Sequence, residues 1–488
     1  MIKLYDIVDK PDYVPDQTEA LYIKEDANIL NFMTYFNSFS ITKWRKYSTI
    51  QTVRLVINHI ANSKLTIYVK RQKDGEMVVV REAIVGEDTF TIELSMTELP
   101  EGLLGFIVEG ATLDRKTIKG AYYGEFASYT PRVLGIGICT YNREEFLMRN
   151  LGVLQPLIEQ NPNIHILVVN NGGPLKGNTS IATVLPNKNF GGSGGFSRAL
   201  LEWEETLTDG DYVLLMDDDI VIDLSVLERT YILLCGLKEE YKENFLGGAM
   251  IRLEEPLVQH ENTAYWGKIR LHSQGQNLQL DDLNDLMENE QPAVTKNQYA
   301  AWWYCCIPVR RIREIGYPLP IFIKGDDIEY SLRNGKEILH MNGIGVWHQG
   351  FQGKRNPVVD YYSDRNMLMM NNFAKDCGFF SFVLAVVGRT FKRLYTGDVI
   401  NYSMLYLALK DYNKGLDYIT RMGSDQKMQE IIDWSKKTHG KYDSIYLLIK
   451  EALLSIVSYH SVKKDYSEFR KNRLSNNKFW KAFLGIKK

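Results

Sequence analysis

The 488-residue sequence is poor in cysteine, in net charge and in long apolar runs. Its five cysteines are an odd number, which excludes a complete set of disulfide pairs and favours a reducing compartment. A formal net charge of −2 argues against a general nucleic-acid binder. The longest apolar run, residues 379–388, is about half as long as a membrane span requires.

A hydrophobic content of 45% is nevertheless enough for sizeable cores, and the chain length predicts about two to four domains. Residues 1–10 include charged side chains and lack the apolar core of a signal peptide. We therefore expect a globular protein that is soluble or peripheral to a membrane.

The first 130 residues are predicted to be rich in β-strands. Short β-prone stretches are separated by turn signals such as Lys73-Asp74-Gly75, and they lie at 52–58, 64–70, 76–81, 89–94 and 104–109. No helical pattern interrupts them. This arrangement predicts a β-sandwich or a barrel, and we assign residues 1–130 to a sandwich domain.

Strands and helices alternate in residues 131–360, which predicts a largely parallel sheet covered by helices on both faces. Strands are expected at 133–139, 164–169, 212–216 and 245–250, and helices at 144–159, 193–207 and 224–242. From residue 361 to residue 488 the pattern is helical. The chain is therefore predicted to have a third, helical domain at its C-terminal end.

Three consecutive carboxylates, Asp217, Asp218 and Asp219, directly follow the predicted strand at 212–216. Alternation along an extended chain points Asp217 and Asp219 to the same side, so the two can share one ion. Hard divalent cations such as Mn²⁺ and Mg²⁺ prefer such oxygen ligands. The alternative is an acidic turn that merely ends a strand.

Polar segments follow the other predicted strands, and ligands of open parallel sheets bind beyond these carboxyl ends. The segment 139–143 ends in Arg143, and Asn170 begins Asn-Asn-Gly-Gly. A glycine-rich loop containing Asn189, Gly191 and Gly192 then enters a helix. The loop matches neither a P-loop nor a dinucleotide motif. It predicts a backbone close to a nucleotide or sugar, or else a flexible turn.

In this order, the motifs resemble the GT-A nucleotide-sugar domain of family-2 inverting glycosyltransferases. The segments 301–306, 322–330 and 346–348 in turn look like those of the galactofuranosyltransferases that build mycobacterial cell-wall galactan. The segments 35–37, 44–47 and 362–366 also resemble that family. The resemblance covers most of the chain and implies a multidomain layout, with an N-terminal β-sandwich, a central α/β GT-A domain and a helical C-terminal domain.

The resemblance assigns roles by matched position. Asp327 matches the catalytic base, and the metal ligands for Mn²⁺ or Mg²⁺ match Asp217, Asp219 and His348. Positions that bind the nucleotide sugar match Arg143, Asn170, Asn189, Gly191, Gly192, Asp218 and Asp326. The acceptor-binding positions match Trp302, Trp303 and Glu261. Without the resemblance, Trp302 and Trp303 would be read as core, and Asp326 and Asp327 as a helix cap.

The implied activity is transfer of galactofuranose from UDP-galactofuranose to a hydroxyl of a lipid-linked cell-surface polysaccharide. The alternatives are another donor, such as dTDP-rhamnose or UDP-glucose, or an inactive carbohydrate-binding protein. Two positions depart from the family. Asn170 replaces an aspartate that reads uracil, which leaves thymidine open, and Gly325 replaces a bulky aromatic, which we expect to open space beside the base.

A lipid-linked acceptor implies a cytoplasmic enzyme held peripherally at the inner face of the cell membrane. The tail 463–488 contains nine Lys and Arg against two acids. Phe479, Trp480, Phe483 and Leu484 have the spacing of one helical face, so we expect the tail to bind an anionic membrane surface. The alternative is that the tail docks on its own domain or on a second subunit of a homo-oligomer.

Overall fold

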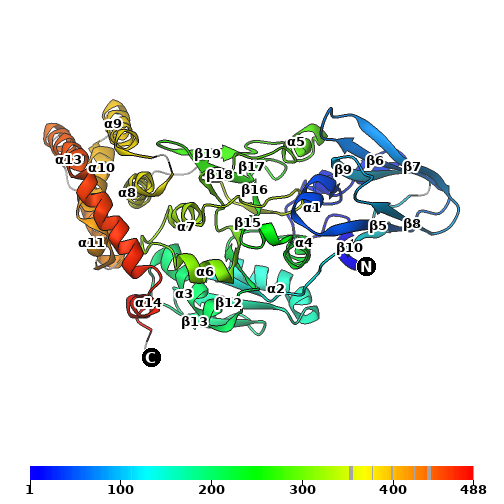
Figure 1. Ribbon diagram of the computed structural model, residues 1–488, viewed down its shortest axis with the longest axis horizontal. Coiled ribbons are helices and arrows are strands. Elements are labelled where there is room, and N and C mark those ends of the chain that lie inside the picture. Colours follow the sequence, from blue (N-terminus) through cyan, green and yellow to red (C-terminus); the bar gives the residue numbers. More distant parts are fainter. Residues whose placement is uncertain are drawn as a thin grey trace.

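The computed structural model describes residues 1–111, 113–350, 356–375, 377–396, 399–421, 424–436 and 441–486. Figure 1 shows the N-terminal strands at one end of the molecule and the C-terminal helices at the opposite end, with a mixed sheet between them. The order of β-rich, mixed and helical regions along the chain agrees with the sequence prediction.

The N-terminal region forms two antiparallel sheets. The first has the order β1 (Ile2–Ile7), β10 (Lys119–Phe126), β5 (Ile50–Asn58) and β8 (Thr89–Ser95). The second has the order β2 (Lys24–Asp26), β3 (Ile29–Asn31), β9 (Gly102–Glu109), β6 (Ser63–Arg71) and β7 (Met77–Val85), with β4 (Phe39–Ser40) beside β9. Alternate side chains of β5 and β6 are buried, as the period-two pattern requires.

A helix interrupts this region, although the sequence pattern showed none. Helix α1 (Ile41–Tyr47) begins at Ser40, whose hydroxyl accepts a hydrogen bond from the backbone N–H of Lys43. Serine is a favoured N-cap residue, so this signal was present in the sequence. Trp44 and Tyr47 are buried, and the helix thereby contributes aromatic side chains to the N-terminal core.

The central sheet positions the candidate site. Its order is β13 (Ala182–Pro186), β12 (Ile164–Asn170), β11 (Leu134–Thr140), β14 (Tyr212–Asp217), β21 (Tyr304–Pro308) and β15 (Leu246–Gly247). The first four strands are parallel, and β21 is antiparallel to both of its neighbours. Helices α2 (Glu144–Gln160), α3 (Gly191–Thr206) and α4 (Leu224–Cys235) alternate with these strands in the sequence.

Two predicted boundaries in this region are wrong. The helix expected at 224–242 ends at Cys235, where the N–H of Gly236 closes the last turn, and only a short 3-10 turn (Glu239–Tyr241) follows. The strand expected at 245–250 is divided between β15 and β16 (Ala249–Arg252), which belong to different sheets. The division occurs at Gly248, where a side chain would lie 2.8 Å from the ring of Tyr304.

Two small sheets extend the mixed region. One has the order β17 (Gln259–Glu261), β16 and β22 (Gly345–His348), and the other has the order β19 (Leu271–Gln274), β18 (Thr263–Trp266) and β20 (Gln298–Tyr299). The remaining helices of this region are α5 (Leu283–Glu288), α6 (Val309–Ile315) and α7 (Asp326–Asn334), and a short 3-10 turn (Glu19–Leu21) lies near the N-terminus.

The C-terminal region is helical. Its elements are α8 (Pro357–Phe373), α9 (Phe379–Thr396), α10 (Val399–Asn413), α11 (Gly415–Arg421), α12 (Ser424–Lys436), α13 (Lys441–Arg473) and α14 (Asn477–Leu484). Within the described residues, one stretch of α13 is long and apolar enough to cross a membrane by length and composition alone, and 28% of its apolar window is buried.

The C-terminal tail docks on the protein's own central region. Trp480 and Leu484 are buried, and the ring of Phe483 lies 4.7 Å from that of Phe190. The apolar face that the sequence assigned to a membrane therefore meets protein instead. Residues 487 and 488 of the tail lie outside the described part of the chain.

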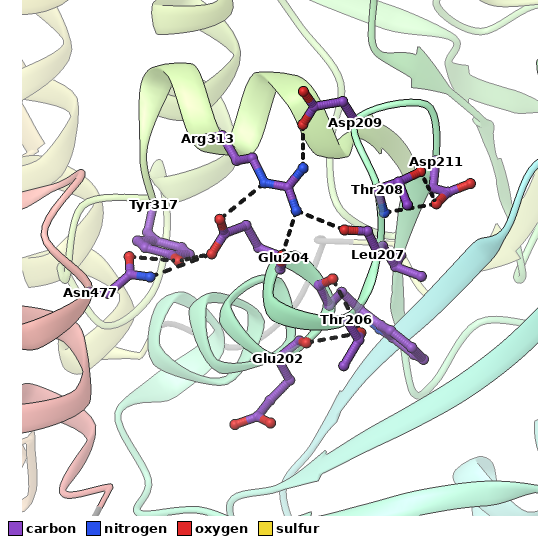
Figure 2. Close-up of polar contacts among 11 residues, drawn as sticks. Glu202, Glu204, Thr206, Leu207, Thr208, Asp209, Asp211, Arg313, Tyr317 and Asn477 are labelled. Atoms are coloured by element: carbon purple, nitrogen blue, oxygen red, sulfur yellow. Dashed lines mark hydrogen bonds and ion pairs between the residues drawn. The ribbon is translucent and has the colours of Figure 1, made fainter. Parts of the chain in front are cut away.

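Polar contacts reinforce this docking (Figure 2). The hydroxyl of Tyr317 lies 3.0 Å from Oδ1 of Asn477, at the start of α14, and 3.0 Å from Oε2 of Glu204 on α3. Arg313 of α6 binds Glu204 and the carbonyl of Leu207. These contacts show that the tail docks within its own chain, although the side chains that it meets here belong to the central region and not to the helical domain.

Candidate functional site

Two strands bring three side chains that can bind a metal close together. Asp217 ends β14, Asp219 follows two residues later, and His348 ends β22. Backbone hydrogen bonds between Val221 and Trp347 hold the two segments side by side. One ligand atom from each of the three side chains lies within 4.8 Å of the others. The predicted pairing of Asp217 with Asp219 and His348 is therefore present in the geometry.

The orientation of His348 suits metal binding. Its Nδ1 lies 2.7 Å from the carbonyl oxygen of Gln349, which can only accept a hydrogen bond, so Nδ1 carries the proton. The other nitrogen, Nε2, lies 3.3 Å from Asp219 Oδ1 and 3.9 Å from Asp217 Oδ2. A metal-binding histidine is commonly oriented through its second nitrogen in this way.

The electrostatics of the cluster favour a bound cation. Burial raises the pKa of the Asp217 carboxyl group to about 7, and the neighbouring carboxylates of Asp219 and Asp218 add to the rise against the effect of His348. Two carboxylates and one imidazole form a donor set that fits Mn²⁺ or Mg²⁺. A divalent cation at this position would offset the repulsion between the carboxylates.

Arg143 and Asp218 lie at the edge of the cluster. A guanidinium nitrogen of Arg143 bonds to Asp219 and lies 3.4 Å from Asp218 Oδ1. Asp218 is buried, which raises the pKa of its carboxyl group, and the nearby hydroxyl group of Thr140 opposes that rise. The backbone carbonyl of Asp218 accepts a bond from Asn150. Sequence reasoning missed Thr140 and Asn150, although Thr140 stands in the polar segment that it singled out.

The glycine-rich loop lies close to the adjacent carboxyl groups of Asp326 and Asp327. Gly191 has a φ of +69°, and a side chain there would lie 2.1 Å from the carbonyl oxygen of Phe322, so glycine is required. Asn189 supports the turn by accepting a hydrogen bond from the Gly191 N–H. A Cβ atom at Gly192 would lie 3.8 Å from Oδ2 of Asp326. The start of helix α3 is therefore next to Asp326, the residue that precedes the predicted base.

Asp326, which is buried, and Asp327, which is partly buried, open helix α7 as adjacent carboxyl groups. Burial raises the pKa of Asp326 to about 8, and the charge of Asp327 adds to this rise, as does that of Asp217. Burial also raises the pKa of Asp327, to about 6. The pair thus lies within electrostatic reach of the metal-type cluster. Perturbed carboxyl groups of this kind are typical of functional sites.

Glu261 lies within electrostatic reach of Asp327. Burial raises the pKa of the Glu261 carboxyl group, and the nearby Asp327 contributes to the rise. The hydroxyl of Tyr299 donates to Glu261 at 3.1 Å, and Ser273 donates to the same carboxylate. The structure therefore places the predicted acceptor-binding glutamate beside the predicted base, although Tyr299 and Ser273 were not foreseen.

The segment before the acidic pair is strained. Phe322, Lys324 and Gly325 all have positive φ values, of +77°, +66° and +91°. Such a backbone persists only where its surroundings hold it. The amide nitrogen of Asn366 donates to the carbonyls of Ile323 and Lys324, each at 2.8 Å.

Arg365 extends this support from the same helix, α8. Its guanidinium donates to the carbonyl of Ile321 at 2.9 Å. Both Arg365 and Asn366 are buried. The sequence motif containing these two residues was noted, but no local signal revealed that they hold the segment that carries the base.

Gly325 was expected to open space beside the base, and the structure shows where that space lies. Its φ of +91° is a conformation that side-chain-bearing residues rarely adopt, so glycine suits this backbone. A Cβ atom there would lie 3.3 Å from Met367 and 3.6 Å from Asn366. The space left by the missing side chain therefore lies against helix α8.

The tryptophan pair is not an exposed platform. Trp302 and Trp303 are only 4% and 6% exposed. The ring of Trp302 packs edge-on against Phe196 at 5.3 Å, and the Nε1 of Trp303 donates to the carbonyl of Gly248 at 2.9 Å. Both rings are packed within the protein, as core residues are. Their role in acceptor binding stays a prediction.

Asn170 is already engaged within its own loop. Its Oδ1 accepts from the N–H of Gly172 at 2.9 Å, and its Nδ2 donates to the carbonyl of Gly173 at 2.7 Å. The oxygen keeps a second lone pair for a nucleobase. Recognition of uracil by Asn170 stays a prediction.

Comparisons with known proteins agree with the resemblance seen in the motifs. Residues 11–123 match a family model described as galactofuranosyltransferase 2 N-terminal. The chain is 26% identical over 437 residues to galactofuranosyltransferase GlfT2 of Mycolicibacterium smegmatis, covering 83% of this chain and 66% of that protein. It is 25% identical over 391 residues to the GlfT2 of Mycobacterium tuberculosis, covering 73% and 60%. The chain thus spans less than two thirds of the length of either relative.

Solved structures give a weaker likeness. A mannosyltransferase from Pyrobaculum calidifontis, in complex with GDP-Man and Mn²⁺, is 12% identical with a TM-score of 0.33, over 67% of this chain and 88% of that one. TarS residues 1–349 from S. aureus, in complex with UDP, are 14% identical with a TM-score of 0.37, over 69% and 91%. Scores this low do not establish a shared fold.

Proposed function

We propose that this chain is a metal-dependent, inverting galactofuranosyltransferase with a central GT-A domain. One observation supports this most strongly: the cluster of Asp217, Asp219 and His348 and the start of helix α3 both lie near Asp326, which is adjacent to the proposed base Asp327. The similarity to galactofuranosyltransferases over most of the chain agrees with it. The proposed domains are a β-sandwich (1–130), the catalytic domain (131–360) and a helical domain (361–488).

The residues of the site have separate tasks in the proposed reaction. Asp217, Asp219 and His348 hold a divalent cation, which supplies positive charge to the diphosphate of the leaving nucleotide. Arg143 adds a second positive charge at the same place. Asp327 takes the proton from the acceptor hydroxyl as that oxygen attacks the anomeric carbon. A single carboxylate base is sufficient for inversion.

The donor is proposed to be UDP-galactofuranose, and the acceptor a lipid-linked glycan. A panel of nucleotide sugars tests the donor when it is incubated with Mn²⁺ and an acceptor, and released nucleotide is measured. Release from UDP-galactofuranose alone supports the proposal. Release from dTDP-rhamnose or UDP-glucose instead would show that the chain uses that nucleotide sugar as its donor. No release, together with glycan binding, would indicate an inactive carbohydrate-binding protein.

Asn366 is predicted to position the base through the strained segment. Asn366→Ala removes the donor to two carbonyls, so the segment 322–325 relaxes and Asp327 moves away from the acceptor hydroxyl. We expect kcat to fall by about a hundredfold, as small misplacements of catalytic groups cause, with little change in donor KM.

The matched control for Asn366→Ala is Asn371→Ala, on the same helix. Asn371 is equally buried, but its amide bonds to Met367 within α8. Both substitutions should lower the melting temperature, and only Asn366→Ala should lower kcat out of proportion. An equal loss of kcat in the two variants would show that Asn366 has a purely structural role.

A further inference from the structure

The glycine-rich loop has one large apolar side chain that can anchor it. Among residues 187–195, four are glycines and Phe190 is the only hydrophobic residue. Glycines leave a backbone free to adopt many conformations, so they do not by themselves hold the loop in one shape. Phe190 directly precedes Gly191 and Gly192, which are predicted to bind the nucleotide sugar. Whatever holds the ring of Phe190 therefore influences the donor site.

The side chain of Phe190 contacts the C-terminal helix. Its Cβ atom lies over the first turn of α3, where a side chain at Gly194 would lie 2.3 Å from it. On α14, the ring of Phe483 meets the ring of Phe190, with 4.7 Å between the two centroids. A cavity of about 30 Å³ is lined by both rings, and also by Phe322 and Tyr362. The loop is thus anchored on a segment that is distant in the sequence.

The chain that leads into α14 is fitted closely to the central region. The backbone of Leu474 passes so near Gly316 that a Cβ atom there would lie 2.6 Å from the Leu474 carbonyl carbon. The Leu474 carbonyl accepts hydrogen bonds from the N–H of Tyr317 at 3.0 Å and from Nε1 of Trp480 at 3.2 Å. Asn477, at the start of α14, also lies beside Tyr317 (Figure 2). These contacts fix the start of α14 against the segment that follows α6.

The end of α13 is fixed to the helix that carries the proposed base. Arg470 forms an ion pair with Glu329 of α7, which is fully buried, with 3.2 Å between Nε and Oε1. The glycine-rich loop meets the segment before α7 as well, because the N–H of Ser193 donates to the carbonyl of Phe322 at 3.1 Å. The support from which α14 extends therefore also holds the base helix.

We propose that α14 holds the nucleotide-binding loop in shape, and that Phe483 is the positioning residue through which it does so. This proposal rests on the proposed function, because the loop belongs to the donor site of that reaction. By filling the space beside Phe190, Phe483 restricts the two glycines that follow it. The loop then has less conformational freedom to lose when a nucleotide binds, and such preorganisation raises affinity.

The alternative is that α14 only completes the apolar core. Trp480 and Leu484 have that role, since they are 0% and 4% exposed. Phe483 is partly buried, and it packs at the edge of that core together with Phe190. Truncating a purely structural side chain lowers stability and leaves the nucleotide affinity of the folded chain unchanged. The two roles therefore differ in their effect on UDP affinity.

Binding of UDP to the full chain with Mn²⁺, measured by calorimetry below the melting temperature, tests the role of Phe483. Phe483→Ala removes the ring that Phe190 contacts and should raise the dissociation constant of UDP by about tenfold, as expected for coupled residues in contact. Phe483→Leu keeps an apolar side chain and should recover part of the affinity. Phe469→Ala is the matched control, because this buried ring on α13 lies against Phe479 at 5.6 Å. It should lower the melting temperature and leave UDP affinity unchanged.

A double-mutant cycle shows whether Phe483 acts through Phe190. Phe190→Ala alone should weaken UDP binding, and adding Phe483→Ala should weaken it little further, because the contact is already lost. If Phe483→Ala does not fold, Phe483→Leu takes its place in the cycle. Effects that multiply in full would overturn the proposal, as would a folded Phe483→Ala variant that binds UDP as tightly as the original chain. An original chain that binds no UDP would overturn the proposed function, on which this proposal rests.

Discussion

Asp219→Ala is expected to abolish sugar transfer. Asp219 lies 3.3 Å from Nε2 of His348, so its loss removes an oxygen ligand from the cluster and leaves Asp217 with one partner. Removing a residue that only supports a metal ligand commonly lowers metal affinity or activity by about 10- to 100-fold. Removing a ligand itself should lower them by at least as much. The fold should persist, because Asp219 lies at the end of a strand and outside the apolar core.

The measurement is the rate of nucleotide release against Mn²⁺ concentration after treatment with a chelator, together with Mn²⁺ binding by calorimetry. Asp223→Ala is the control, because Asp223 caps helix α4 through the N–H of Ser225 and lies outside the cluster. It should lower stability by more than the roughly 1 kcal/mol of a lost cap, because Tyr22 also donates to its carboxylate, and it should leave the dependence on Mn²⁺ unchanged. Near-normal turnover of Asp219→Ala in metal-depleted buffer would contradict the assignment of the site.

Asp327→Asn is expected to lower kcat by at least about a hundredfold, because the amide keeps the shape of the carboxylate and cannot accept a proton. The affinity for the donor should change little, since Asp327 lies toward Glu261 and the predicted acceptor side. Binding of UDP by calorimetry separates the two effects. If donor affinity collapses while kcat holds, then Asp327 belongs to the donor site.

The pH dependence gives an independent test of the base. Burial raises the pKa of Asp327 to about 6. A general base works only when it is deprotonated, so kcat/KM should fall as the pH decreases through about 6 and should be level just above it. The rate that remains in Asp327→Asn should lack this acidic limb. A limb that survives the substitution would assign the titration to another group.

Local patterns in the sequence were sufficient to predict much of the central sheet. Three of the four parallel strands, β11, β12 and β14, were predicted from their apolar runs, whereas β13 was not. Because parallel strands end at one edge, Arg143, Asn170 and Asp217 were expected to meet there. Alternation also predicted that Asp217 and Asp219 share a side. These features depend on neighbours within a few residues. The single strand predicted at 245–250 was wrong, because the chain is divided at Gly248 by its contact with Tyr304, which is distant in the sequence.

The sequence by itself determined the chemistry that is available, namely which carboxylates, imidazole and glycines the chain offers and in what order. Only the tertiary structure decided which faces are covered. It buried Trp302 and Trp303, placed Asn366 under the strained segment, and packed the tail against Phe190. An amphipathic helix has the same spacing whether its apolar face meets protein or lipid. The partner that covers the face comes from another part of the chain, so its identity depends on the packing of the whole molecule.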